Sequence, residues 1–157
     1  MRIQLIAAGR RMPSWVQQGY EVYAKRLPRY WHLELLEIPL GKRTASSDVA
    51  RAVTEEGDRM LAAIGASSRV VAFDERGRSM ATEELAKQLA TWMADAQDVA
   101  LLIGGPDGLA DSCRRRADEI WSLSNLTLAH PVVRIVIAEQ LYRAHSIIQG
   151  APYHRDG

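Results

Sequence analysis

Short apolar runs alternate with longer amphipathic stretches along most of this chain. Each run has the length of a strand, and residues 99–103 are apolar throughout, which is typical of a strand covered on both faces. An alternation of this kind predicts an α/β fold in which a mostly parallel sheet of five to six strands carries helices on both faces. The expected strands are residues 3–8, 33–38, 69–74, 99–103 and, as a strand or an extended loop, 122–128.

The stretches between these runs predict five helices. Pro13 opens the first helix, Ser47 or Asp48 is a candidate N-cap for the second, and Gly65 ends the second. Two polar loops are expected, a basic one at 41–47 and a charged one at 74–79. The expected helices are residues 13–27, 48–64, 82–93, 131–150 and a short polar one at 111–121.

Length and charge bound the class of protein. With 157 residues, the chain is expected to form a single domain, residues 1–157. A net charge of +1 argues against nonspecific coating of nucleic acid, and the basic groups at 25–29, 42–43 and 114–116 are interpreted as solvated faces or loops. The single cysteine, Cys113, excludes an intrachain disulfide and gives no support to a metal site. No signal peptide or membrane span is recognised, so we expect a cytoplasmic protein without a membrane partner.

A glycine-rich segment at 101–109 follows the fourth expected strand. Its glycines allow a tight turn and let a ligand lie directly against the backbone. The segment is neither a P-loop nor a dinucleotide fingerprint, so a plain turn and a ligand loop both stay open. Because parallel sheets bind ligands beyond the carboxyl ends of their strands, the loops after Phe73, after Ile103 and around Leu128 matter most.

The last third of the chain holds three further candidates. Residues 123–128 alternate Ser and Thr with Leu, which suits the edge of a nucleobase, with an ordinary strand of alternating faces as a strong alternative. The helix at 131–150 is apolar around most of its girth, which indicates a subunit interface as much as a core. Within it, Glu139 and Arg143 are four residues apart and can pair, as a simple ion pair or in a catalytic role. By composition, the tail after Pro152 is expected to fray.

Together these segments resemble the ribosomal RNA large subunit methyltransferase H family, the small members of the SPOUT methyltransferases. The likeness covers essentially the whole chain in order, and the combination is highly specific, although Phe73 stands where the family often has Leu. The matching stretches are residues 4–9, 37–39, 101–109, 123–128 with His130 and Pro131, Arg134 with 138–144, and the end Tyr153, His154, Arg155.

The resemblance implies a homodimer with a trefoil knot at the C-terminal end of the sheet. It implies transfer of a methyl group from S-adenosylmethionine to N3 of a pseudouridine in 23S ribosomal RNA, on the assembled ribosome. It also implies that the tail reaches an active site formed with the partner subunit, which reverses the expectation from composition. The implied cofactor contacts are Phe73, Gly104, Leu123, Ser124, Asn125, Leu126, Thr127 and Leu128.

Such a reaction needs alignment of donor and acceptor and removal of the N3 proton. From residue types and the matched motif, we hypothesise that His154 or Tyr153 assists the proton transfer. Arg143 and Arg155 would hold RNA phosphate or the developing anion. Two other classes stay open: a noncatalytic RNA- or nucleotide-binding module of the same fold, and an unrelated flavodoxin-like phosphate or flavin binder.

Overall fold

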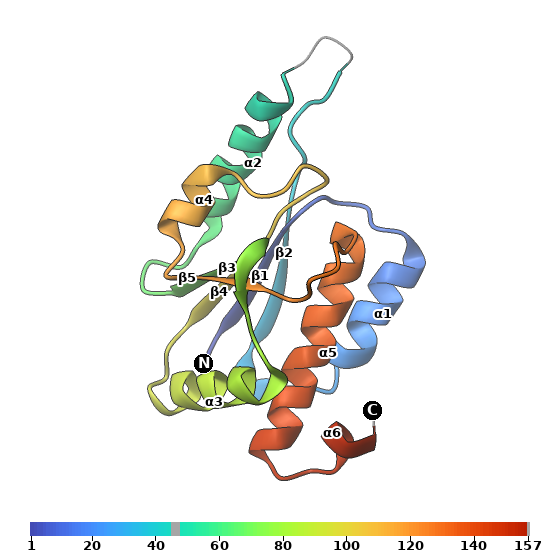
Figure 1. The fold of residues 1–157 in the computed structure, drawn as a ribbon, viewed down its shortest axis with the longest axis vertical. Coiled ribbons are helices and arrows are strands. Elements are labelled where there is room, and N and C mark those ends of the chain that lie inside the picture. Colours follow the sequence, from blue (N-terminus) through green and yellow to red (C-terminus); the bar gives the residue numbers. More distant parts are fainter. Residues whose placement is uncertain (45–47, 157) are drawn as a thin grey trace.

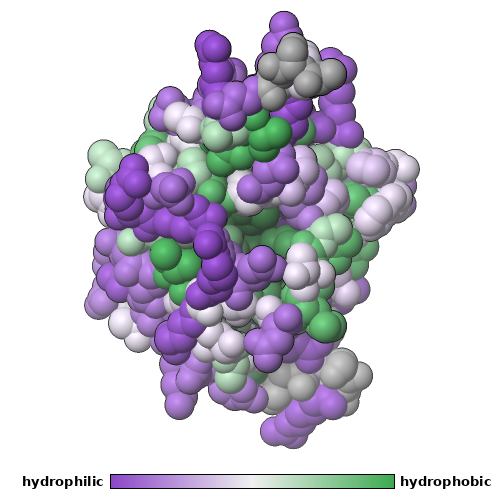
Figure 2. All heavy atoms as spheres, turned by 45° about the horizontal axis from the view of Figure 1, so that its top comes forward, coloured by the Kyte–Doolittle hydropathy of each residue, from purple (hydrophilic) through white to green (hydrophobic). Residues whose placement is uncertain are grey.

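A sheet of five parallel strands, in the order β2-β1-β4-β3-β5, forms the centre of the molecule (Figure 1). The computed structural model describes residues 1–44 and 48–156, without the side chains of His154 and Asp156. The carboxyl ends of the strands point to the top of Figure 1, the end that Figure 2 brings forward. The expected parallel α/β sheet is confirmed. Its strands are β1 (Ile3–Ala8), β2 (Leu33–Ile38), β3 (Arg69–Ser79), β4 (Val99–Ile103) and β5 (Glu119–Ser122).

Helices cover both faces of this sheet, as the alternation predicts. Helices α1, α3 and α5 contribute to the core on one face, and α2 and α4 to the core on the other. The helices are α1 (Ser14–Ala24), the 3-10 turn η1 (Arg29–Trp31), α2 (Val49–Ala63), α3 (Thr82–Ala94), α4 (Asp111–Arg116), α5 (His130–Ile148) and the single turn α6 (Tyr153–Asp156).

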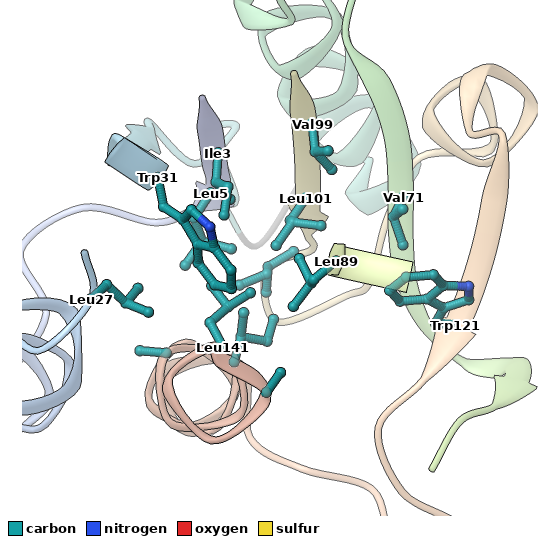
Figure 3. Packing of buried hydrophobic residues seen from close by; sticks show 14 of the residues in the cluster. Ile3, Leu5, Leu27, Trp31, Val71, Leu89, Val99, Leu101, Trp121 and Leu141 are labelled. Carbon is teal, nitrogen blue, oxygen red and sulfur yellow. The ribbon is translucent and has the colours of Figure 1, made fainter. Parts of the chain in front are cut away.

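Side chains that alternate along the central strands build two hydrophobic cores. Leu5 and Leu101 face the core that contains Leu141 of α5, and Figure 3 shows their side chains directed toward that helix. Their neighbours Ile6 and Leu102 point the other way, into the core under α2 and α4. Burial of each such side chain contributes about 1.5–3 kcal/mol, so β1 and β4 form a rigid frame whose carboxyl ends can carry a site.

Much of helix α5 is covered within one chain. It packs against α1, α3 and the sheet, and every residue from 131 to 148 is buried or partly buried. The core of a single subunit therefore accounts for part of its apolar girth, and the expected subunit interface stays a prediction. None of the helices in the described part of the chain is both long and apolar enough to cross a membrane.

The charged segment after Phe73 is a strand, and the expectation of a loop there was wrong. Strand β3 continues to Ser79 and pairs again with β5, after a register shift between Phe73 and Arg78. Gly77 permits this pairing, since a Cβ there would lie 2.7 Å from the carbonyl carbon of Trp121. The shift leaves the residues between the two paired parts free to face a cavity rather than the ladder.

The end of the expected helix at 111–121 was also wrong. Helix α4 stops at Arg116, and Glu119–Ser122 is strand β5, so residues 123–129 form the loop that follows it. Asp118 explains the change, because its amide donates to the Val70 carbonyl at 2.8 Å and its carboxylate accepts the Val70 amide at 2.8 Å. Pairing with β3 therefore sets the conformation of this segment, although its local sequence favours a helix.

Two further expectations concern the start of α2 and the tail. The Asp48 carboxylate accepts the Ala50 amide at 2.9 Å and caps α2, whereas the alternative cap, Ser47, lies outside the described residues. The tail forms the helical turn α6 on α5, so the expectation of fraying from composition was wrong.

Two partly buried histidines give the fold a pH dependence. Burial lowers the pKa of His145 below the ordinary 6.5, and burial together with Arg134 lowers that of His130. The unfolded chain then binds more protons than the folded one below about pH 6.5, so stability is present above that pH and is lost on acidification. We expect the free energy of unfolding in urea to fall from pH 7.5 to 5.5. A His145→Gln variant should show a shallower dependence, and an unchanged slope would contradict this origin.

Candidate active site

A cavity of about 790 Å³ opens at the carboxyl ends of β3, β4 and β5. Its volume lies within the roughly 300–1,000 Å³ typical of small-molecule sites. Figure 2 shows this end of the molecule, where hydrophilic side chains surround a hollow with hydrophobic walls. The walls come from the three loops that the sequence singles out, and include residues 73–76, 103–109, 122–124 and 126–130.

The glycine-rich loop after β4 is packed too tightly for side chains at its base. A Cβ on Gly104 would lie 2.6 Å from the carbonyl carbon of Gly108 and 2.7 Å from the amide nitrogen of Leu109. The Gly108 amide donates to the Gly105 carbonyl at 3.1 Å, and Gly108 has a φ of +83°, which favours glycine. Gly104, Gly105 and Gly108 thus line the cavity without side chains, and a plain turn and a ligand loop both stay open.

The segment after β5 forms another wall of the cavity. Its hydroxyl groups hold its shape, since Ser124 Oγ accepts the Leu126 amide at 2.9 Å and Thr127 Oγ1 donates to Glu75 Oε2 at 2.9 Å. Leu126 is 75% exposed. All the residues for which cofactor contact was predicted line the cavity except Asn125, which does not.

Phe73 supplies an apolar wall whose position is fixed by tryptophans. Its ring meets Trp121 edge to face, with centroids 6.2 Å apart, and Trp121 stacks on Trp92 at 5.7 Å. Such pairs contribute about 0.5–1.5 kcal/mol beyond the area they bury. The aromatic contact holds the carboxyl end of β3 in one place.

Beside Phe73, a buried carboxylate is neutralised by two arginines. Asp74 accepts from Arg114 Nε at 2.8 Å and from Arg76 Nε at 3.2 Å. Burial by itself would raise the pKa of Asp74, but the hydrogen bonds from Arg76 and Arg114 outweigh it and lower the pKa to about 2. Asp74 therefore remains ionised and paired at neutral pH, and serves to fix the wall rather than to exchange protons.

A second ion-pair network clamps the glycine loop from outside. Arg43 forms two parallel bonds of 3.0 Å to the carboxylate of Glu56, which is 3% exposed, and a third of 2.8 Å from Nε to Asp107 of the glycine loop. These bonds raise the pKa of Arg43. The interpretation of Arg43 as a solvated loop residue was wrong, because it ties the loop after β2 to α2 and to the cavity wall.

Arg43→Ala is expected to destabilise the protein by about 3 kcal/mol, since it leaves the buried carboxylate of Glu56 without its ionic partner. For a chain of this length that corresponds to a fall in Tm of roughly 10 °C, which calorimetry would measure. The matched control is the double variant Arg43→Met with Glu56→Met, which removes both charges and should recover most of the loss. If Arg43→Ala were as stable as the parent protein, the ion pairs of Arg43 would contribute nothing to stability.

The clamp has a sequence signal that reasoning from charge runs missed. Ala52, Glu56 and Met60 are four residues apart on one face of α2, and all three are buried. A carboxylate in the middle of an apolar helical stripe indicates a buried partner of opposite charge. The partner itself, Arg43, cannot be identified from spacing alone.

The predicted catalytic residues form a separate cluster on α5 and α6. The Glu139–Arg143 pair is confirmed at 2.6 Å, and the Tyr153 hydroxyl donates to the same carboxylate at 3.2 Å. The Tyr153 ring packs on Tyr142, with centroids 4.6 Å apart, under the Arg143 guanidinium at 4.9 Å. Burial and the Glu139 charge raise the pKa of Tyr153, so its phenol stays protonated. Arg155 is exposed, and the side chain of His154 lies outside the described residues.

Within one chain, this cluster does not lie at the cavity. None of Arg143, Tyr153 and Arg155 lines it, whereas His130 at the start of α5 does. Thirteen residues separate His130 from Arg143 in the helix, which at 1.5 Å per residue is about 20 Å along its axis. Within a single chain, the loops that line the cavity and the tail therefore lie apart.

In the described part of the chain, no group of three or more His, Cys, Asp or Glu side chains has the arrangement of a metal site. A parallel sheet with a cavity at its carboxyl edge and a glycine loop against that cavity is the arrangement in which α/β proteins bind small ligands.

Comparison with known proteins narrows the class of protein to one family. The chain matches the family described as "Predicted SPOUT methyltransferase" over residues 1–154. It is 53% identical over 155 residues to the "Ribosomal RNA large subunit methyltransferase H" of Methylococcus capsulatus, with 99% of this chain and 100% of that protein covered. Identity to the protein of the same name from Thioalkalivibrio sulfidiphilus is 55% over 156 residues, with the same coverage. The crystal structure of a "probable methyltransferase" from Bordetella pertussis aligns with a TM-score of 0.58 at 13% identity, over 90% of this chain and 95% of that one, a likeness of fold alone.

The chain belongs to the SPOUT methyltransferases and, within them, to the ribosomal RNA large subunit methyltransferase H family. The family membership predicted from the sequence is confirmed.

Proposed function

We propose that this protein transfers a methyl group from S-adenosylmethionine to N3 of a pseudouridine in 23S ribosomal RNA on the assembled ribosome. It would act in the cytoplasm as a homodimer of single-domain chains, residues 1–157. The observation that carries the proposal is the convergence of Phe73, the glycine loop and residues 123–128 on one cavity, in a chain of this family. Relatives that are 53–55% identical are named as ribosomal RNA methyltransferases.

The cavity suits the proposed cofactor. It has room for a nucleoside-sized ligand, an apolar wall at Phe73 and Leu128, and backbone at Gly104, where a side chain would collide with the loop itself. Bound there, S-adenosylmethionine supplies a methyl group on a sulfonium sulfur that is already a good leaving group. The residues that would hold it are Phe73, Gly104 and the segment from Leu123 to Leu128, with Asn125 in that segment but outside the wall.

The protein then has to align the methyl acceptor and remove its N3 proton. Alignment can lower a barrier by roughly 7–11 kcal/mol in the best cases, and a general base adds about 10²–10⁴-fold. The raised pKa of Tyr153 makes its phenol a hydrogen-bond donor, which favours His154 as the proton acceptor on residue type. Arg143 and Arg155 would hold phosphate or the developing anion.

A homodimer would complete the site. The tail lies about 20 Å along α5 from the cavity of its own chain, so a two-fold axis that sets two copies of α5 antiparallel would exchange the tails between cavities. We also propose the C-terminal trefoil knot of the family, in which the chain after β5 would pass through the glycine loop. A knot would fix both cofactor loops against each other.

The test of function is mass mapping of ribosomal RNA from a strain that lacks the gene, before and after complementation. One methylated pseudouridine should disappear and return. With the purified protein, labelled methyl groups should pass to ribosomes and hardly at all to protein-free RNA, since a net charge of +1 suits a pre-assembled target recognised by shape. Binding of RNA without any transfer would identify a noncatalytic module instead.

A further inference from the structure

Two loops at the carboxyl end of the sheet carry exposed cations that face no carboxylate. Arg10 and Arg11 follow β1, and Lys42 follows β2, the strand paired with β1. Among residues 1–44 and 48–156, no carboxylate oxygen lies within the 4.0 Å ion-pair distance of these three side chains. Their charge is therefore available to a partner.

Other cations at this end of the molecule are used internally. Arg43 is bound by Glu56 and Asp107, and Arg114 by Asp74 and Asp111. These pairs cancel the charge of the cavity wall. The positive charge left for a partner is concentrated on the two loops beside the cavity.

The residues beside these cations are anchored to the rest of the fold. Arg134, which is 2% exposed, donates to the Gly9 carbonyl at 2.6 Å and to the Ala8 carbonyl at 3.3 Å. Beyond them, Arg11 has a φ of +56°, a left-handed conformation that costs a non-glycine residue about 1–2 kcal/mol. In the second loop, Lys42 is adjacent to the clamped Arg43. The backbone that carries the cations is thus held in place before any partner arrives, which lowers the entropy cost of binding.

The two loops adjoin the mouth of the cavity. A Cβ on Gly9 would lie 3.6 Å from Cε1 of His130, which lines the cavity, and Arg43 bonds to Asp107 in the cavity wall. A chain lying across Arg10, Arg11 and Lys42 would therefore lie beside the cavity.

An exposed indole extends the same surface. Trp15 lies in the first turn of α1, directly after the loop that carries Arg10 and Arg11, and is 56% exposed. Exposed aromatic rings beside cations are the usual platform for single-stranded nucleic acid, because every base has a face that stacks. An acidic protein segment would use the cations but would leave the indole without a role.

We propose that Arg10, Arg11, Lys42 and Trp15 form a docking surface for single-stranded RNA, on which the three cations contact phosphates and Trp15 stacks on an unpaired base. This inference rests on the proposed function and names how its substrate is held. It gives a chain of net charge +1 a local basic field where the acceptor base must enter.

The test compares two triple variants that remove the same charge. The docking variant is Arg10→Gln, Arg11→Gln, Lys42→Gln, and the matched control is Lys25→Gln, Arg29→Gln, Lys87→Gln, which removes exposed cations from other parts of the surface. Binding to ribosomes from the gene-deletion strain is measured against potassium chloride concentration, together with methyl transfer. The docking variant should weaken binding and raise KM by about 10- to 100-fold. It should also reduce the slope of log K against log salt by about 2, because each phosphate that is no longer neutralised lowers the slope by about 0.7. The control should stay within about threefold of the parent.

Trp15→Ala should weaken binding by about tenfold without changing the salt slope, and Trp15→Phe should restore most of it, since stacking is not ionic. Calorimetric affinity for S-adenosylmethionine and Tm should be unchanged in every variant. Equal losses in the docking and control variants, or an unchanged salt slope, would overturn the proposal. If the parent protein bound ribosomes with a steep salt slope but transferred no methyl group, the proposed function would fail, while the same comparison of slopes would still decide the docking surface.

Discussion

A protein that lacks residues 153–157 is expected to lose methyl transfer by at least about 1,000-fold, while its affinity for S-adenosylmethionine changes by less than about threefold. The deletion removes His154, Tyr153 and Arg155, which are assigned to proton transfer and anion binding. It leaves the cavity intact, because none of the tail side chains that the structure describes lines it. Methyl transfer to ribosomes and calorimetric titration of the cofactor measure the two effects separately. Full activity of the truncated protein would show that the tail takes no part in catalysis.

The deletion also uncovers Tyr142, on which Tyr153 packs, so a control for folding is needed. The double variant His154→Ala with Arg155→Ala keeps that aromatic contact and should reproduce the loss of activity with an unchanged Tm. If only the deletion lost activity and its Tm fell in parallel, the tail would be structural.

Mixed dimers decide whether the tail acts on the partner's cavity. One protomer lacks residues 153–157, and the other carries Gly104→Val with an intact tail. Each homodimer should be inactive. Random mixing makes about half the dimers mixed, each with one complete site of two, so about a quarter of the parental activity should return. If each chain used its own tail, no protomer in the mixture would be complete and no activity would return.

Gly104→Val is the second change for which a large effect is expected, a loss of cofactor affinity of at least about 100-fold. The first atom of any side chain at this position would lie 2.6 Å from the carbonyl carbon of Gly108 and 2.7 Å from the Leu109 nitrogen. Both contacts are with backbone, so the loop itself must move, and the cavity wall moves with it. Titration calorimetry with S-adenosylmethionine measures the loss, and Gly104→Ala should already show most of it.

The neighbouring glycine provides the matched control. At Gly105 a Cβ would meet the end of the Leu40 side chain at 3.1 Å and the Cβ of Ala8 at 3.4 Å, and a leucine can rotate away. Gly105→Ala should therefore change cofactor affinity by less than about threefold. Equal losses at both positions would point to general damage to the loop rather than to a cradle at Gly104.

The sequence predicted the frame of the site well because burial on both faces leaves a clear pattern. Strands β1, β2 and β4 have the boundaries expected from their apolar runs. The segments that failed, 74–79 and 117–121, carry charged residues and no continuous apolar run, and their conformation depends on pairing between β3 and β5. Local propensity carries no information about the strand with which a segment pairs, so it predicted a loop at 74–79 and a helix at 117–121 instead.

By itself, the sequence determined the α/β sheet and the loops that would meet at its carboxyl edge, because periodic burial and turn-forming glycines act locally along the chain. The resemblance of its motifs to known proteins determined the family. Only the tertiary structure decided that Arg43, Glu56 and Asp107 clamp the glycine loop and that the tail lies on α5, away from the cavity of its own chain. Those facts depend on contacts between residues far apart in sequence, whose distances follow from how the helices pack on the sheet. The direction and length of α5 separate the two halves of the proposed site by about 20 Å, and no pattern within either motif encodes that distance.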